Sequence, residues 1–557
     1  MDSKHDTLER TLSIREQPSS FTVASTLHWT PESRTPASIL SKRTLTDDTE
    51  IAIPQDVEDL LHVKELDVDA RGVVHWREDS ITHPRCWPVW RKGYDSAVIC
   101  LLEFFTTLIS NTGSSVARYA SDDIGVSNEL AIFCFVTLYL FGLAIGGLLF
   151  PPIAESFGGR TIYLFGAAGF SISCLIVGAS PTLPAVIVGR FFSGFFSAMP
   201  TVVAVGSIEN MWDAKGRIWV IQIWVMMAIF ALALGPPVAT YVSESSAGWQ
   251  WVYYGAAIGN TLLAFMCIYM QESRPALVLR HQVRLIEKAT NFKGLSLDDE
   301  LRVPTVREFI QNNLILPLRL WFTEPLVFLV ALMAAVSFGF IYLFAEALHV
   351  VYHTNFGLSQ KESSLTFLAI GVGALLTWIP RLYDVHLYNM ERKTGHAVEP
   401  EKKLLGYYIA APVLAAGLWW FALTVPPLTD NITIWASILS LVLVGYGIVE
   451  FDSVLCAYLT DTYTSYAGSA NAPVAFLRAV LSGVFPLFAP KKFENLGANN
   501  AVFVLAGIAT GFCGIALGFR FYAKGIRERS PFAQKTSVVV GKMEVKVHRK
   551  IVVTEEV

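Results

Sequence analysis

The chain contains about twelve apolar stretches of roughly 20 residues, and this repetition restricts its fold more than any other feature. A helix of that length crosses the hydrocarbon core of a bilayer, where every backbone polar group must be satisfied within the protein. The composition agrees, because only 16% of the 557 residues are charged, against about 25% in a typical soluble protein. The sequence therefore predicts an all-α membrane protein that crosses the bilayer many times.

Length and hydropathy place the predicted spans in two groups of six, on either side of a charged linker. The spans lie near residues 96–118, 130–150, 161–180, 184–207, 217–241 and 250–271, and near 325–347, 363–380, 405–425, 432–458, 471–490 and 500–523. We expect five segments: a disordered cytoplasmic N-terminal tail (1–85), a six-helix half (86–271), a cytoplasmic central linker (272–323), a second six-helix half (324–525) and a cytoplasmic C-terminal tail (526–557).

Basic residues gather in alternate loops, in the linker and in the tail. They include Arg160, Lys215, Arg217, Arg274, Arg381, Arg392, Lys393, Lys402, Lys403, Lys524 and Arg527. The positive-inside rule then puts both termini and the linker in the cytoplasm. We expect the cell membrane as the location, with the vacuolar membrane as the alternative.

Polar residues recur at helical spacing in two spans, so each set shares one helix face. The first set is Glu103, Thr107, Ser110 and Ser114, and the second is Arg190, Ser193, Ser197 and Thr201. Such faces are costly against lipid, which favours an internal, wetted cavity. We predict that Trp224, Tyr342 and Tyr446 also line this cavity.

Ionisable residues at membrane depth are candidates for proton coupling or substrate contact, and the alternative is a buried ion pair that only stabilises helix packing. These residues are Glu103, Arg190, Glu346, Glu450, Asp452 and Arg478. Glu450 and Asp452 are two residues apart on one helix and point to roughly opposite faces. We predict that Glu450 faces the cavity, while Asp452 pairs with a neighbouring helix or lies near the interface.

Motifs for other classes of protein are missing. The sequence has no GxxxxGK[ST] phosphate loop, no HExxH, no paired CxxC and no GxSxG elbow. We therefore expect neither ATP-driven transport nor an enzyme, and we expect no cofactor and no metal site.

Four segments resemble signatures of one family. GGLLFPPIAESFGGR (146–160) carries Pro152, Glu155, Gly158 and Arg160 at positions of a signature between the second and third spans. GRFFSGFFSA (189–198), ALGPPVATYV (233–242) and GSANAPVAFLRAVLSGVFPLF (468–488) resemble its fourth-, fifth- and eleventh-span patterns. The chain is thereby similar to the fungal twelve-span drug:proton antiporter group of the major facilitator superfamily, to which polyamine, multidrug and toxin exporters such as the cercosporin facilitator belong.

The resemblance implies a major facilitator fold and a proton-coupled secondary transporter that exports a hydrophobic or amphipathic small molecule. It implies that the 146–160 loop acts as a hinge and gate, that Arg190 takes part in proton coupling, and that Gly235, Pro236 and Pro237 form the antiporter motif. The two prolines should break their helix and free backbone carbonyls, which are tolerable only if they face protein or water.

Two other functions remain open at this point, an importer of a small nutrient on the same fold and a transporter-like sensor. As partners we expect a small-molecule substrate, protons and the lipid bilayer, with no nucleic acid, and we expect a monomer.

Overall fold

The structure, a computed structural model, describes residues 53–69, 72–77, 80–292, 294–297, 311, 315–394, 400–428, 433–463 and 467–534. Within these residues, 12 helices are long and apolar enough to cross a membrane. Each predicted span coincides with one of them, which confirms the predicted fold class. Several helices extend beyond the predicted limits, because hydropathy detects only the part in hydrocarbon. The first, α2, has 36 residues.

The membrane helices of the first group are α2 (Val89–Ile124), α3, η3 and α4 in series (Asn128–Ile132, Phe133–Thr137, Leu138–Phe157), α5 (Gly159–Ala179), α6 (Leu183–Met211), α7 (Ala214–Ser243) and α8 (Gln250–Ile268). Those of the second group are α12 (Pro325–His349) with η6 (Val350–Asn355), α13, α14 and α15 in series (Gln360–Leu365, Leu368–Leu375, Trp378–Thr394), α16 (Leu405–Thr424), α17 (Ile434–Thr462), α18 (Ala467–Leu496) and α19 (Ala498–Arg529). The shorter elements are α1 (Gln55–Val63), β1 (Leu66–Val68), β2 (Val74–Trp76), η2 (Pro84–Cys86), α9 (Pro275–Thr290), α11 (Leu316–Thr323) and η7 (Pro400–Leu404).

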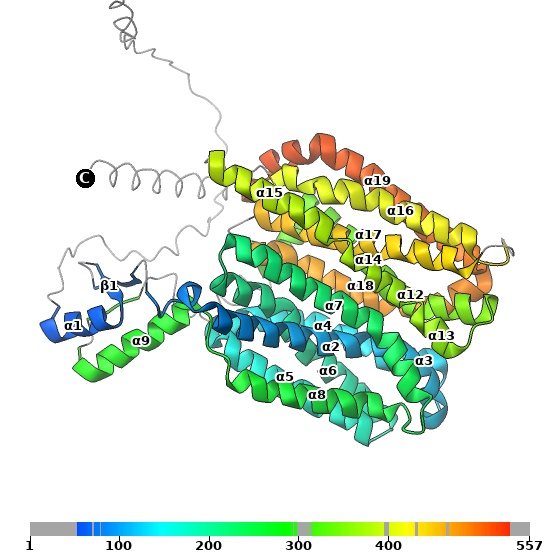
Figure 1. Cartoon of the computed structure of the whole chain (residues 1–557), viewed down its shortest axis with the longest axis horizontal. Helices are drawn as coiled ribbons and strands as arrows, with labels where there is room; N and C mark the ends of the chain where they lie inside the picture. The colour runs from blue at the N-terminus through cyan, green and yellow to red at the C-terminus, as the bar shows by residue number, and fades with distance from the viewer. Residues whose placement is uncertain are drawn as a thin grey trace, which may run out of the picture. The chain divides into compact units, whose positions relative to one another are not determined.

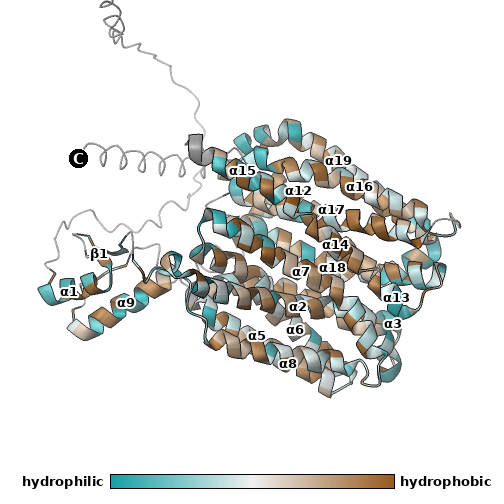
Figure 2. Ribbon diagram, in the orientation of Figure 1, coloured by the Kyte–Doolittle hydropathy of each residue, from teal (hydrophilic) through white to brown (hydrophobic). Residues whose placement is uncertain are grey.

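The helices of each group pack against one another, and the two groups also meet at a shared interface. In the first group α2 packs on α7, α4 on α6 and α5 on α8, and in the second α12 packs on α18 and α16 on α17 and α19. Across the interface α4 meets α18, α7 meets α14 and α2 meets α12, and Figure 1 shows the two groups side by side. Hydrophobic residues run along the helices, whereas hydrophilic residues gather near α3 and α13 at one end and near α15 at the other (Figure 2).

The approach of α4 to α6 depends on glycine. A Cβ atom added at Gly142 would overlap the backbone of Phe191, and one added at Gly194 would overlap the backbone of Tyr139. Small residues let membrane helices come close enough for backbone contact, which gains van der Waals energy that lipid cannot replace.

Helix α7 contains Pro236 and Pro237 and nevertheless continues to Ser243, so the prediction that the prolines break this helix is wrong. Pro236 has no N–H for the carbonyl of Leu232 four residues earlier. Asn111 of α2 donates to that carbonyl instead, with Nδ2 2.8 Å from the oxygen. The Leu232 carbonyl therefore has a protein partner, as expected, and α2 is bonded to α7 at the proline.

A small folded unit precedes the membrane helices, so the prediction of disorder throughout 1–85 is wrong from residue 53 onward. Strand β1 pairs with β2 in an antiparallel hairpin beside α1. The backbone N–H of Val74 donates to the carbonyl of Ser296 in the linker at 3.0 Å. Leu61 of α1 and Val283 of α9 are buried in one apolar cluster. The sequence did not show the partner, because α1 buries its short apolar face against the hairpin and also against α9 of the distant linker. The remaining tail, 1–52, lies outside the described residues.

We expect Asn111→Ala to lower the thermal stability of the purified protein, because the Leu232 carbonyl would lose its partner in an apolar environment. A membrane hydrogen bond between helices contributes about 1 kcal/mol. Asn500 is the matched control, since its Nδ2 also donates to a carbonyl, that of Leu496, but its side chain is exposed. A melting temperature of Asn111→Ala no lower than that of Asn500→Ala would contradict the role of Asn111.

We expect Leu61→Ala to open the unit formed by α1, the hairpin and α9. A buried Leu→Ala change costs about 2–5 kcal/mol, and Leu61 is 3% exposed. Hydrogen exchange of the α9 amides should therefore accelerate. Val63→Ala, at a side chain 75% exposed, should leave it unchanged. Equal exchange in both variants would show that α9 is ordered independently of α1.

Candidate functional site

A cavity of about 130 Å³ lies between the two helix groups. Its walls come from α2, α4, α6 and α7 on one side and from α12, α17 and α18 on the other. Five predicted cavity residues line it, namely Thr107, Ser110, Ser197, Trp224 and Tyr342. The hydroxyls of Ser110 and Tyr342 lie 2.7 Å apart and join α2 to α12 across the cavity. The polar face predicted for the first span is therefore a cavity wall.

Glu103 is the acidic group of the α2 wall, as predicted. It is 3% exposed, and its carboxylate accepts hydrogen bonds from Thr107 at 3.1 Å and from Thr201 at 3.0 Å. Both partners are neutral hydroxyls rather than a cation. A buried carboxylate without a cation at contact distance is favourable as a neutral acid and costly as an anion. Such a group can gain and lose a proton as its surroundings change.

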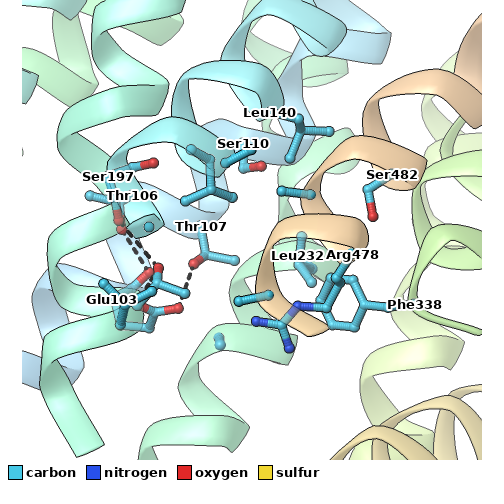
Figure 3. Close-up of a pocket in the computed structure, with 18 of the residues that line it drawn as sticks. Glu103, Thr106, Thr107, Ser110, Leu140, Ser197, Leu232, Phe338, Arg478 and Ser482 are labelled. Atoms are coloured by element: carbon cyan, nitrogen blue, oxygen red, sulfur yellow. Dashed lines mark hydrogen bonds between the residues drawn. The ribbon is translucent and has the colours of Figure 1, made fainter. Parts of the chain in front are cut away.

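Asp452 and Arg478 form the charged part of the opposite wall. Arg478 Nη1 lies 2.9 Å from Asp452 Oδ2, and its guanidinium carbon lies 4.7 Å from the centre of the Phe338 ring. Both side chains keep some exposure, 14% for Asp452 and 24% for Arg478, and both line the cavity. Figure 3 shows Glu103 on one side and Arg478 with Phe338 on the other.

Glu450 points away from this cavity, so the prediction that it is the cavity-facing acid of α17 is wrong. Its Oε1 lies 2.5 Å from Nη2 of Arg381 on α15, and it is fully buried. The expectation that the two acids face opposite sides is confirmed, with the assignment reversed. Helical spacing gives the angle between two side chains but not which neighbouring helix occupies each side. Tyr446 and Ser114 also lie outside the set of residues that line the cavity.

Arg190 is fully buried behind the cavity wall rather than in it. Its Nε donates to the carbonyl oxygen of Phe135 at 2.8 Å, and its Nη1 lies 3.4 Å from that of Ile109. The guanidinium also lies 4.4 Å from the centre of the Tyr139 ring. Phe135 belongs to η3, a single π-helical turn in which the regular α-helical bonding is interrupted. These contacts give Arg190 a structural role at that turn.

Glu346 also lies outside the cavity lining and pairs across the interface. Its Oε2 accepts from Nη2 of Arg118 on α2 at 2.9 Å. Two further pairs join the groups near the same end of α2, Lys361 with Glu244 at 3.2 Å and Lys491 with Glu129 at 2.8 Å. Together they join the two helix groups at this end.

The predicted hinge loop joins α4 to α5. Gly158 has φ +95°, a conformation that glycine adopts without strain. Glu272, which the sequence interpretation did not include, accepts from the backbone N–H groups of Gly159 and Arg160, each at 3.2 Å. Its carboxylate therefore caps the N-terminus of α5, where negative charge is favourable, while burial raises the pKa of Glu272. The side chains of Pro152 and Glu155 lie outside the described residues.

Two more residues named in the sequence analysis line the cavity, Arg478 as an ionisable residue at membrane depth and Thr201 on the polar face of the fourth span. Three further polar residues of the lining were not named there, Thr106, Tyr139 and Ser482. Each is a polar residue on an apolar span, and nothing further in the sequence indicated its role.

Comparison with known proteins identifies the family. Residues 99–486 match the Major Facilitator Superfamily, and the chain belongs to it. It is 27% identical over 461 residues to the multidrug transporter FLU1 of Candida albicans, covering 82% of this chain and 75% of that protein. It is 26% identical over 462 residues to the cercosporin transporter CTB4 of Cercospora nicotianae, covering 82% of this chain and 89% of that protein.

Solved structures show the same fold. The proton:xylose symporter XylE superposes with a TM-score of 0.57 at 16% identity, over 78% of this chain and 97% of that one. The superfamily is one of membrane transporters, so the cavity between the two halves is the candidate transport site.

We expect Arg190→Met to destabilise the fold by about 2–4 kcal/mol, because the carbonyls of Phe135 and Ile109 would lose bonds to a charged donor. The melting temperature of the purified protein measures this. Arg520→Met is the control, since Arg520 lies over the ring of Tyr408 but is exposed. A stable Arg190→Met protein that has lost only proton coupling would instead support the role implied by the family resemblance.

Proposed function

We propose that the chain is a proton-coupled secondary transporter that exports a hydrophobic or amphipathic small molecule. The main support is Glu103, a carboxylate buried in the cavity and held by two hydroxyls, with no cation at contact distance among the residues that the structure describes. The similarity to transporters named for multidrug and cercosporin transport supports the direction and the class of substrate. No chemical conversion of the substrate is part of this proposal.

In the proposed cycle, the proton and the substrate occupy the cavity in turn. A proton that enters from outside neutralises Glu103, and the bonds from Thr107 and Thr201 rearrange around the neutral acid. Substrate is released to the outside, and loss of the proton to the cytoplasm resets the site. The two halves rock between states, as in other transporters of this fold.

The interface contacts supply the two gates of this cycle. Near one end the ion pairs of Glu346, Glu244 and Glu129 join the halves. Toward the other end Gln222 of α7 donates to the hydroxyl of Thr377 at 2.8 Å. Each set breaks in turn as the cavity opens to one side, and water then solvates the separated groups.

The proposed orientation has both termini in the cytoplasm of a monomer in the cell membrane. Its support is the excess of Lys and Arg in alternate loops. This orientation places the end with α13 outside and the end with α15 inside.

We expect Glu103→Gln to insert and fold but to lose gradient-driven transport in proteoliposomes. A pH gradient of one unit supplies about 1.4 kcal/mol per proton, which can drive about tenfold accumulation. Flux of a panel of fluorescent amphipathic compounds, charged and neutral, is measured with and without that gradient. The wild type should accumulate substrate against the proton flow, and the variant should only equilibrate it.

The exposed Glu528 of α19 provides the matched control, because Glu528→Gln removes the same charge away from the cavity. It should transport as the wild type does. Wild-type accumulation by a correctly inserted Glu103→Gln protein would refute the role of Glu103, and the absence of gradient dependence in the wild type would refute proton coupling.

A further inference from the structure

The Asp452–Arg478 pair presents a donor and an acceptor side by side to the cavity. Asp452 Oδ2 accepts from Arg478 Nη1, whereas Asp452 Oδ1 is buried and has no hydrogen-bond partner among the described residues. An arginine carries five N–H donors, and this bond occupies one nitrogen. The pair can therefore accept one hydrogen bond through Asp452 and donate another through Arg478 without separating.

Two further groups of the cavity lining have buried atoms without a partner in the part of the chain that the structure describes. They are Nε1 of Trp224 and Oγ of Ser482, and Ser482 is 1% exposed. A buried polar atom without a partner is unfavourable. Both groups can therefore gain a hydrogen bond from a ligand in the cavity.

Net charge is unfavourable for such a ligand. The pair is neutral as a whole, so its attraction and repulsion of a charged ligand largely cancel. A charged ligand would therefore lose its hydration in the cavity without a net opposite charge that compensates the loss. A neutral ligand loses less hydration and still bonds to both partners.

We infer that the cavity selects an uncharged aromatic compound that carries a hydrogen-bond donor beside an acceptor, such as a primary amide or a hydroxyl next to a carbonyl. The inference rests on the proposed function and specifies its substrate class. The donor bonds to Asp452 Oδ1, the acceptor takes bonds from Arg478, and the ring packs against Phe338 and Trp224.

Four naphthalene probes that share one ring system separate charge from hydrogen bonding. They are 2-naphthamide, its N,N-dimethyl amide, 2-naphthoate and 2-naphthylmethylammonium. Equilibrium binding to the full-length protein in lipid nanodiscs is measured against nanodiscs without protein. We expect 2-naphthamide to bind saturably and each of the others about tenfold more weakly, because each loses a bond or carries a charge whose lost hydration the neutral pair does not compensate. Equal or tighter binding of either charged probe overturns the inference.

Two variants then shift the charge preference in opposite directions. In Asp452→Asn the charge of Arg478 is no longer balanced, so binding of 2-naphthoate should strengthen about tenfold. In Arg478→Gln the charge of Asp452 is no longer balanced, so binding of 2-naphthylmethylammonium should strengthen by a similar factor. Asp461→Asn is the control, because Asp461 lies on the same helix and pairs with Lys403 outside the cavity. Loss of folding weakens all probes together and cannot produce opposite shifts.

The binding assay tests the assigned selectivity, and the flux assay tests the proposed transport, so either claim can be refuted without the other. Amide-selective binding without gradient-driven flux refutes the proposed transport and leaves the assigned selectivity standing. Gradient-driven flux, with the charged probes binding as tightly as 2-naphthamide, refutes the selectivity and leaves the transport standing. Unchanged probe preference in both cavity variants refutes the part assigned to the Asp452–Arg478 pair.

Discussion

The structure depends above all on satisfying backbone hydrogen-bond groups where there is no water. Helices meet this requirement for most residues, and two exceptions determine how neighbouring helices fit. At Pro236 the freed carbonyl of Leu232 is bonded by Asn111 of α2. At the π-helical turn the carbonyl of Phe135 is bonded by Arg190 of α6. Both hydrogen bonds join neighbouring helices, α2 to α7 in the first case and α6 to η3 in the second. A local interruption of the backbone bonding in one helix is therefore satisfied by a side chain of the next.

Buried charges follow a similar rule, because each needs a partner that compensates its lost hydration. Glu450 has Arg381, Glu346 has Arg118 and Asp452 has Arg478. Glu103 differs, since its partners are the hydroxyls of Thr107 and Thr201. The pairs stabilise particular helix contacts. A carboxylate held only by hydroxyls has the smallest compensation for its charge, which makes it the natural proton carrier in the proposed cycle.

Prediction of the site succeeded where the relevant property belonged to a single helix. Helical spacing placed Glu103, Thr107 and Ser110 on one face, and all three line the cavity. It failed where the answer depended on a second helix. Glu450 and Asp452 were correctly separated by angle, but the position of Arg381 on α15 decided which acid was enclosed. Ser114 continues the same face, yet it lies beyond the end of the cavity.

The sequence by itself determined the class of fold. Twelve apolar segments of membrane length can satisfy their backbones in lipid only as helices, and their division by a charged linker predicts two halves. It also determined which residues bear charge at membrane depth. Tertiary structure decided how those charges are paired and which of them reach the cavity. The physical reason is that hydropathy and periodicity are properties of one segment, whereas a partner for Arg190, Glu450 or Leu61 is supplied by a segment distant in the chain.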